Sequence, residues 1–105
     1  MTRVKIDPGV CGFPALVTVE KKDRQHFRVT IESNCEMVRK LGEEIASLTM
    51  QDAFIRFSDN RVYEKASTCL KHTACPVPSG ILKALEVEAG LAVPRNVTVE
   101  FLAGE

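Results

Sequence analysis

The sequence predicts an α+β protein, a two-layer sandwich with helices on one face of a mostly antiparallel sheet of about four strands. Three observations lead to this prediction. Apolar and polar residues alternate in three short segments near the N-terminus. Apolar residues then recur at helical spacing through the middle of the chain. A last alternating segment near the C-terminus indicates a closing strand.

The alternating N-terminal segments define three strands, within 3–7, 15–20 and 26–32. In the third, Phe27, Val29 and Ile31 share one face. The polar segment 21–25 is typical of a hairpin connection, so the second and third strands should pair antiparallel. The other face of this sheet is expected to be exposed to solvent. Its side chains would include Thr18, Glu20, Arg28, Thr30, Thr98 and Glu100.

A first helix is expected after the third strand, because Ser33-Asn34-Cys35-Glu36 has the pattern of a capping box. Gly42 lies inside this helix and costs about 1 kcal/mol relative to alanine, which suggests that another backbone comes close. The apolar stripe of the helix comprises Met37, Val38, Leu41, Ile45 and Leu48.

Two further helices are expected before the closing strand. Segment 49–52 resembles a second cap, and 53–57 fits either a short helix or a strand. A second helix then ends near Lys71, and the last begins at Ser79 or Gly80 and ends at Gly90. Pro94 bars its continuation. The closing strand carries Val97, Val99 and Phe101.

Length and charge narrow the function classes. The chain has 105 residues, which fits one domain over 1–105. Its 14 Lys plus Arg residues balance 14 Asp plus Glu residues, so no basic field favours nucleic acid as a partner. The N-terminus lacks the apolar run of a signal peptide, and no apolar run is long enough to span a membrane. These features indicate a cytoplasmic protein that does not bind a membrane.

Four cysteines are the residues most suited to chemistry. In a reducing compartment they are expected to be free thiols or metal ligands rather than disulfides. Cys35 falls in the first turn of the first long helix, and Cys75 lies just ahead of the last one. Unpaired N–H groups and the helix dipole favour a thiolate at such positions.

A metal site is the leading interpretation of the cysteine pattern. Cys69-x-x-His72-x-x-Cys75 places three donors within seven residues, and short gaps let a chain wrap one ion. Cys11 and Cys35 would complete the set if the fold brings them near. We therefore expect a small accessory or sensor protein that binds zinc or an iron–sulfur cluster through Cys11, Cys35 and Cys75, with Cys69 or His72 as the fourth ligand.

Two other classes of function fit the same residues. In a thiol-dependent redox enzyme, Cys35 would be the reactive thiol, with His72 as its base and Glu36 orienting it. The absence of a Cys-x-x-Cys pair argues against a thioredoxin-like mechanism. In a metal-free interaction module with a protein partner, Cys35 and Cys69 would simply fill the core and His72 would be solvated.

The chain also resembles a family of small, uncharacterised prokaryotic domains with four cysteines. The motifs that carry this resemblance include Cys11-Gly12-Phe13, Ser33-Asn34-Cys35 and Cys75-Pro76-Val77-Pro78. The last of these runs into segments 83–86 and 90–94, so the resemblance covers nearly the whole chain. It implies one compact domain and directs attention to Cys11, Cys35 and Cys75, but it implies no activity.

Overall fold

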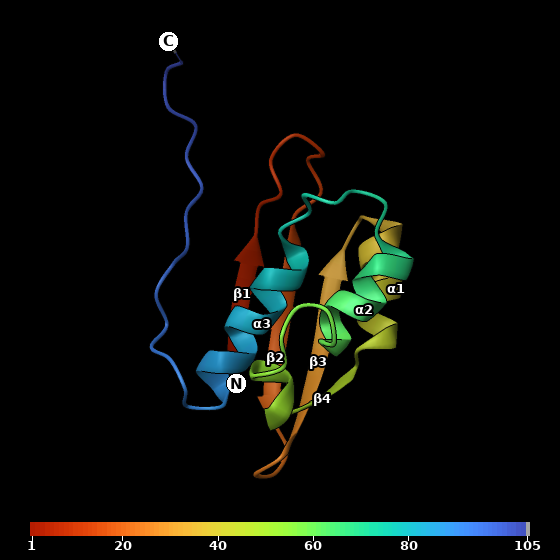
Figure 1. The fold of residues 1–105 in the computed structure, drawn as a ribbon, viewed down its shortest axis with the longest axis vertical. Coiled ribbons are helices and arrows are strands. Elements are labelled where there is room, and N and C mark those ends of the chain that lie inside the picture. The colour runs from red at the N-terminus through yellow and green to blue at the C-terminus, as the bar shows by residue number, and fades with distance from the viewer. Residues whose placement is uncertain (105) are drawn as a thin grey trace.

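A computed structural model describes residues 1–104 (Figure 1). It confirms the predicted fold class: a four-stranded antiparallel sheet in the order β1-β2-β3-β4, covered by helices. The elements are β1 (Thr2–Ile6), β2 (Ala15–Lys21), β3 (His26–Ser33), α1 (Glu36–Glu44), β4 (Ser47–Thr49), the 3-10 helix η1 (Met50–Ala53), α2 (Arg61–Cys69) and α3 (Val77–Glu88).

The alternation of the first three strands sorts side chains between core and solvent as predicted. Val17 lies opposite Ile31 and Val19 opposite Val29, on the face that the helices cover. On the other face, Arg28 and Thr30 of β3 are exposed. Burial of the apolar face stabilises the fold by roughly 25 cal/mol for each Å² removed from water.

The helices lie on this apolar face. A Cβ added to Gly42 of α1 would lie 3.2 Å from the Cβ of Ile31, and one added to Gly80 of α3 would lie 2.3 Å from Cδ1 of Ile6. Both contacts are to side chains of the sheet. The close neighbour expected at Gly42 is therefore a side chain of β3 and not a second backbone.

The fourth strand does not lie where the sequence predicts it. It is β4, which pairs with β3 and places the fully buried Leu48 opposite Phe27. The predicted helix stripe through Leu48 is therefore wrong beyond Ile45, the C-cap of α1. The predicted closing strand with Val97, Val99 and Phe101 is also wrong: this segment is not part of the sheet. Alternation indicates a segment suited to a strand, but it does not supply a pairing partner.

Two helix starts also differ from prediction. Ser33 remains in β3, and its Oγ accepts a hydrogen bond from the Cys35 N–H at 3.1 Å. Cys35 is the N-cap of α1 and makes no side-chain cap bond, so the predicted capping box does not form. Helix α3 begins at Val77, two residues before Ser79, because proline is tolerated in a first helical turn.

The connection between β4 and α2 is held by a buried polar cluster. The predicted cap at 49–52 is confirmed, since Asp52 accepts from the Thr49 N–H at 2.7 Å. Asn60 caps α2 by accepting from the Val62 N–H at 2.9 Å. Its amide also donates to the carbonyl oxygens of Asp52 and Ile55. These bonds satisfy the polar groups that the segment buries.

Glu88 closes one end of the sheet. Its carboxylate accepts from the Thr2 hydroxyl at 2.7 Å and from the Lys21 N–H at 3.0 Å, and it lies 3.2 Å from the terminal ammonium group of Met1. Its side chain is only 12% exposed. These contacts join the last turn of α3 to the N-terminal end of β1 and the C-terminal end of β2.

Candidate functional site

Three chain connections meet at the other end of the sheet. Ile6 pairs with Ala15, and Ala15 pairs with Ser33. The 7–14 loop and the β3–α1 connection therefore leave the sheet at the same end of its strands. Gly80 near the start of α3 lies against Ile6. The α2–α3 connection therefore reaches this end as well, as Figure 1 shows at the top of the molecule. Each of the three connections carries one cysteine.

Cys11 lies at the turn of the 7–14 loop. Gly9 and Gly12 have φ angles of 85° and 72°, and the Gly12 N–H donates to the Gly9 carbonyl at 3.0 Å. Such left-handed angles favour glycine, which explains why the turn is built from these residues. The Asp7 carboxylate also accepts from the Gly9 N–H at 3.0 Å. The side chain of Cys11 is left exposed.

Cys35 is half-buried at the start of α1. Its carbonyl accepts from the Arg39 N–H at 3.0 Å, which is the first bond of the helix. The guanidinium group of Arg39 turns back and donates to the Ser33 carbonyl at 3.0 Å. This positive charge next to the β3–α1 connection was not predicted from the sequence. Arg39 lies four residues after Cys35, a spacing that brings side chains together on a helix and could have indicated it.

Cys75 is half-buried just ahead of α3. The Cys75 N–H donates to the His72 carbonyl at 3.1 Å, which closes a tight turn. Pro76 is the N-cap of α3, and Pro78 lies in its first turn. The fixed φ of proline limits how the chain can enter the helix, and so limits where Cys75 can lie.

The pKa of Cys75 is affected by its surroundings at this end of the sheet. Burial raises the pKa of Cys75, and the negative charges of Cys11 and Cys35 raise it further; a hydrogen bond from the Val77 N–H opposes both effects without overcoming them. Cys11 and Cys35 can act on Cys75 in this way only because the fold brings all three to one region, although 24 residues separate Cys11 from Cys35 and 40 separate Cys35 from Cys75.

Cys69 and His72 have different surroundings. Cys69 is 8% exposed and belongs to the hydrophobic core, at the last residue of α2. Its Sγ lies 3.9 Å from the Thr68 hydroxyl. His72 is exposed in the α2–α3 connection. The structure thus brings together Cys11, Cys35 and Cys75, with His72 adjacent along the chain, and it places Cys69 among apolar side chains.

A complete ligand set is not formed. Within residues 1–104, no group of three or more His, Cys, Asp or Glu side chains is arranged so that it would hold a metal ion. The metal centre expected from the sequence is therefore not shown. The three cysteines share one end of the molecule, but their sulfur atoms would have to move closer to coordinate one ion.

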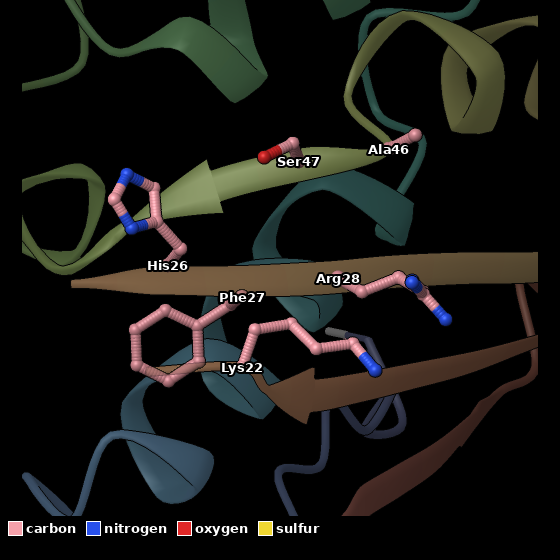
Figure 2. Close-up of a pocket in the computed structure, with 6 residues that line it drawn as sticks. All are labelled: Lys22, His26, Phe27, Arg28, Ala46 and Ser47. Atoms are coloured by element: carbon pink, nitrogen blue, oxygen red, sulfur yellow. The ribbon is translucent and has the colours of Figure 1, made fainter. Parts of the chain in front are cut away.

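A shallow depression at the opposite end offers less chemistry (Figure 2). It has a volume of about 250 Å³ and is lined by Lys22, His26, Phe27, Arg28, Ala46 and Ser47. Two of its three basic side chains have acidic partners: Lys22 pairs with Glu20, and His26 lies 2.9 Å from the Asp23 carboxylate. The third, Arg28, lies opposite Glu20 in the strand register, so these acidic residues offset part of the positive charge.

Comparisons with known proteins assign a family without an activity. In the part of the chain that is described, no helix is long and apolar enough to cross a membrane. No curated protein and no solved structure matches the chain. A family model described as "Family of unknown function (DUF6951)" matches residues 2–101, a range that includes all four cysteines. The chain therefore belongs to this family of unknown function, as the resemblance to an uncharacterised four-cysteine family led us to expect.

Proposed function

We propose that the protein binds a thiophilic metal centre, either zinc or an iron–sulfur cluster, through Cys11, Cys35 and Cys75. One observation supports this proposal above the others. The charges of Cys11 and Cys35 both act on Cys75, from three connections that the sheet register gathers at one end. Cys11 is exposed, and Cys35 and Cys75 are half-buried at the margin of the core, so all three thiols are more accessible than the buried Cys69.

The electrostatics favour a cation at this end. Ionised sulfur atoms repel one another, and this repulsion contributes to the raised pKa of Cys75. A metal cation removes the repulsion and displaces the remaining proton, because thiolates and not thiols are the ligands. Metal binding should therefore release protons, and the apparent affinity should rise as the pH rises towards the pKa of Cys75.

Coordination of one ion requires the 7–14 loop to move. Zinc–sulfur bonds of about 2.3 Å require the ligand sulfurs to lie within roughly 4 Å of one another. Cys11 is exposed, and a Cβ added at Gly9 or Gly12 would meet no other atom within 4 Å, so the space around the loop is open. Under this proposal, metal binding draws Cys11 towards Cys35 and Cys75 at the starts of α1 and α3.

His72 is the better candidate for a fourth ligand. It is exposed and lies in the same tight turn as Cys75. Cys69, by contrast, would have to leave the hydrophobic core to reach the metal. Three thiolates and an imidazole form a closed structural zinc site, whereas a site that keeps one position open suits exchange or catalysis. We propose an accessory or sensor role with either arrangement.

Cobalt titration tests the proposal directly. Co²⁺ added without oxygen to reduced, metal-free protein should give thiolate-to-cobalt absorbance at about one ion per chain, and Zn²⁺ should displace it. Cys75→Ser should remove this absorbance, and Cys69→Ser is the matched control that should keep it. An iron–sulfur cluster would instead appear as visible absorbance in protein purified without oxygen.

Some results would contradict the proposal. One is a wild-type protein that takes up no cobalt, carries no iron and leaves all three thiols open to alkylation. In that case, a single thiol reacting unusually fast at neutral pH would favour the thiol-dependent enzyme instead. Equal loss of cobalt absorbance in Cys75→Ser and Cys69→Ser would contradict the assignment of ligands.

A further inference from the structure

The C-terminal segment is suited to a strand but has no partner strand. Val97, Val99 and Phe101 alternate with polar residues and are 63%, 89% and 99% exposed. The last backbone hydrogen bond near this end runs from the Leu91 N–H to the Glu86 carbonyl. Figure 1 shows residues after α3 running along the side of the molecule, apart from β1. Within the described chain, the N–H and C=O groups of 92–104 thus pair with no backbone partner.

The sheet has a free edge that matches this segment. β1 pairs with β2 on one side only, because it is the first strand in the order β1-β2-β3-β4. Its outer edge presents unpaired backbone groups, the kind of surface that accepts an added strand. β1 has five residues, and the alternating segment 96–101 is of closely similar length.

We propose that this C-terminal segment, 96–101, adds as a strand to β1 of a second copy of the chain, and that two copies exchange these segments reciprocally. Each monomer supplies one such segment and one free β1 edge, and a reciprocal exchange between two copies closes the assembly as a dimer. The proposal is independent of metal binding, since neither the segment nor β1 contains a cysteine.

The side chains are complementary on both faces of the proposed pair. With Val97, Val99 and Phe101 on the core side, they would extend the apolar face on which Val4 is half-buried and Ile6 buried. The alternate residues would then lie on the outer face of the sheet. There, the acidic Glu100 would approach the exposed Arg3 and Lys5 of β1. Opposite charges on neighbouring strands stabilise a pairing.

A second copy is favoured over the same chain because of where the segment runs. The end of α3 is fixed beside β1 by the hydrogen bond between Glu88 and Thr2. From there the chain leaves the helix through Gly90, which has a φ of 78°, and within residues 1–104 it runs along the side of the molecule without contacting β1 through backbone hydrogen bonds (Figure 1). The segment starts next to its own β1, yet it does not pair with it.

Light scattering and hydrogen exchange test the proposal on the full chain. We expect wild-type protein to have the mass of a dimer at high micromolar concentration and to dissociate on dilution. The amides of 96–101 should be protected from exchange in the dimer and lose protection as it dissociates. Val99→Asp combined with Phe101→Asp should give a monomer with an unchanged circular dichroism spectrum. Val93→Asp, which alters an exposed apolar residue outside the segment, should remain dimeric.

Three results would overturn the proposal. A monomeric wild type at every concentration, with rapid exchange of these amides, would show that the segment has no partner of this kind. A monomer in which the same amides are protected equally at all concentrations would show that the segment pairs within its own chain. A dimer that persists unchanged in the double aspartate variant would place the interface elsewhere.

Discussion

The two ends of the sheet differ in how the protein stabilises the charged form of an ionisable side chain, Glu88 at one end and Cys75 at the other. At one end, the Glu88 carboxylate accepts hydrogen bonds from Thr2 and Lys21 and lies beside the terminal ammonium group. At the other end, burial raises the pKa of Cys75, charge on Cys11 or Cys35 would raise it further, and a single N–H, from Val77, opposes these effects. The charged form of Glu88 is stabilised by its neighbours, whereas the thiolate form of Cys75 is not.

This difference separates a structural role from a ligand-binding role. Burial alone would raise the pKa of Glu88, but the hydrogen bonds from Lys21 and Thr2 and the terminal ammonium group outweigh it, so the pKa is lowered. For Cys75 the burial effect prevails and the pKa is raised. The neighbours of Glu88 thus stabilise its charged form, whereas those of Cys75 favour the neutral thiol; under the proposed function, a metal cation would stabilise the Cys75 thiolate instead.

Replacement of Cys75 should have the largest effect, and on metal binding rather than stability. Cys75→Ser removes one of three proposed sulfur ligands, so the affinity for Co²⁺ or Zn²⁺ should fall by about 100-fold or more, equivalent to about 2.7 kcal/mol. The free energy of unfolding of the metal-free protein should change by less than about 1 kcal/mol. Calorimetric metal titration and urea unfolding measure the two effects.

Replacement of Glu88 should show the reverse pattern. Glu88→Ala leaves the Lys21 N–H and the Thr2 hydroxyl without their acceptor, which should lower the free energy of unfolding by about 2 kcal/mol. Metal affinity should be unchanged. Glu86→Ala, on the same helix, is the matched control and should cost less than about 0.5 kcal/mol. If both variants unfold at the same urea concentration, the role given to Glu88 is wrong.

Cys69→Ser should have an intermediate effect on stability. Cys69 is buried in the core at the end of α2, and a hydroxyl group placed there is costlier to bury than a thiol. We expect a loss of about 1 kcal/mol in urea unfolding with no loss of metal. A clear drop in metal affinity instead would make Cys69 the fourth ligand in place of His72.

The smallest expected effects are on the pH dependence of stability. Glu88, at one end of the sheet, should affect the acid side of the stability–pH profile, and Cys75, at the other end, the alkaline side. Glu88 has a folded pKa below its ordinary 4.5, so its contribution is present above 4.5 and is lost as the pH falls through the folded pKa. Cys75 has a folded pKa above 9.0, so stability is lost as the pH rises past 9.0 towards it. Glu88→Gln should flatten only the acid limb of the melting temperature, and Cys75→Ser only the alkaline limb.

The sequence predicted the fold class because local patterns dominate it. Alternation in β2 and β3 and the stripe of α1 are set by short-range sequence, and they were placed correctly, apart from the extension of the stripe beyond Ile45 to Leu48. The position of the fourth strand was not predictable in this way. Leu48 fits a helix stripe and a strand equally well, and its pairing with Phe27 depends on where α1 ends. The alternation of apolar and polar residues in 96–101 was identified from the sequence, but local sequence does not show which strand, if any, this segment pairs with.

The candidate site was predicted in part. Its cysteines were identified from residue type and from their positions near helix starts. What the sequence cannot give is the register that joins Ile6, Ala15 and Ser33 and thereby gathers the loops. Nor does spacing alone distinguish Cys69 from Cys75, which are six residues apart. Burial distinguishes them, and burial depends on how α2 and α3 pack against the sheet.

The metal content of protein purified without oxygen tests the central claim most directly. We predict about one zinc ion, or iron and sulfide in cluster proportions, per wild-type chain by elemental analysis, with the metal lost from Cys75→Ser and retained in Cys69→Ser. The opposite result is a wild-type chain free of zinc and iron, in which Cys11, Cys35 and Cys75 are alkylated as readily as model thiols. That result would mean that the cysteine end of the sheet holds no metal.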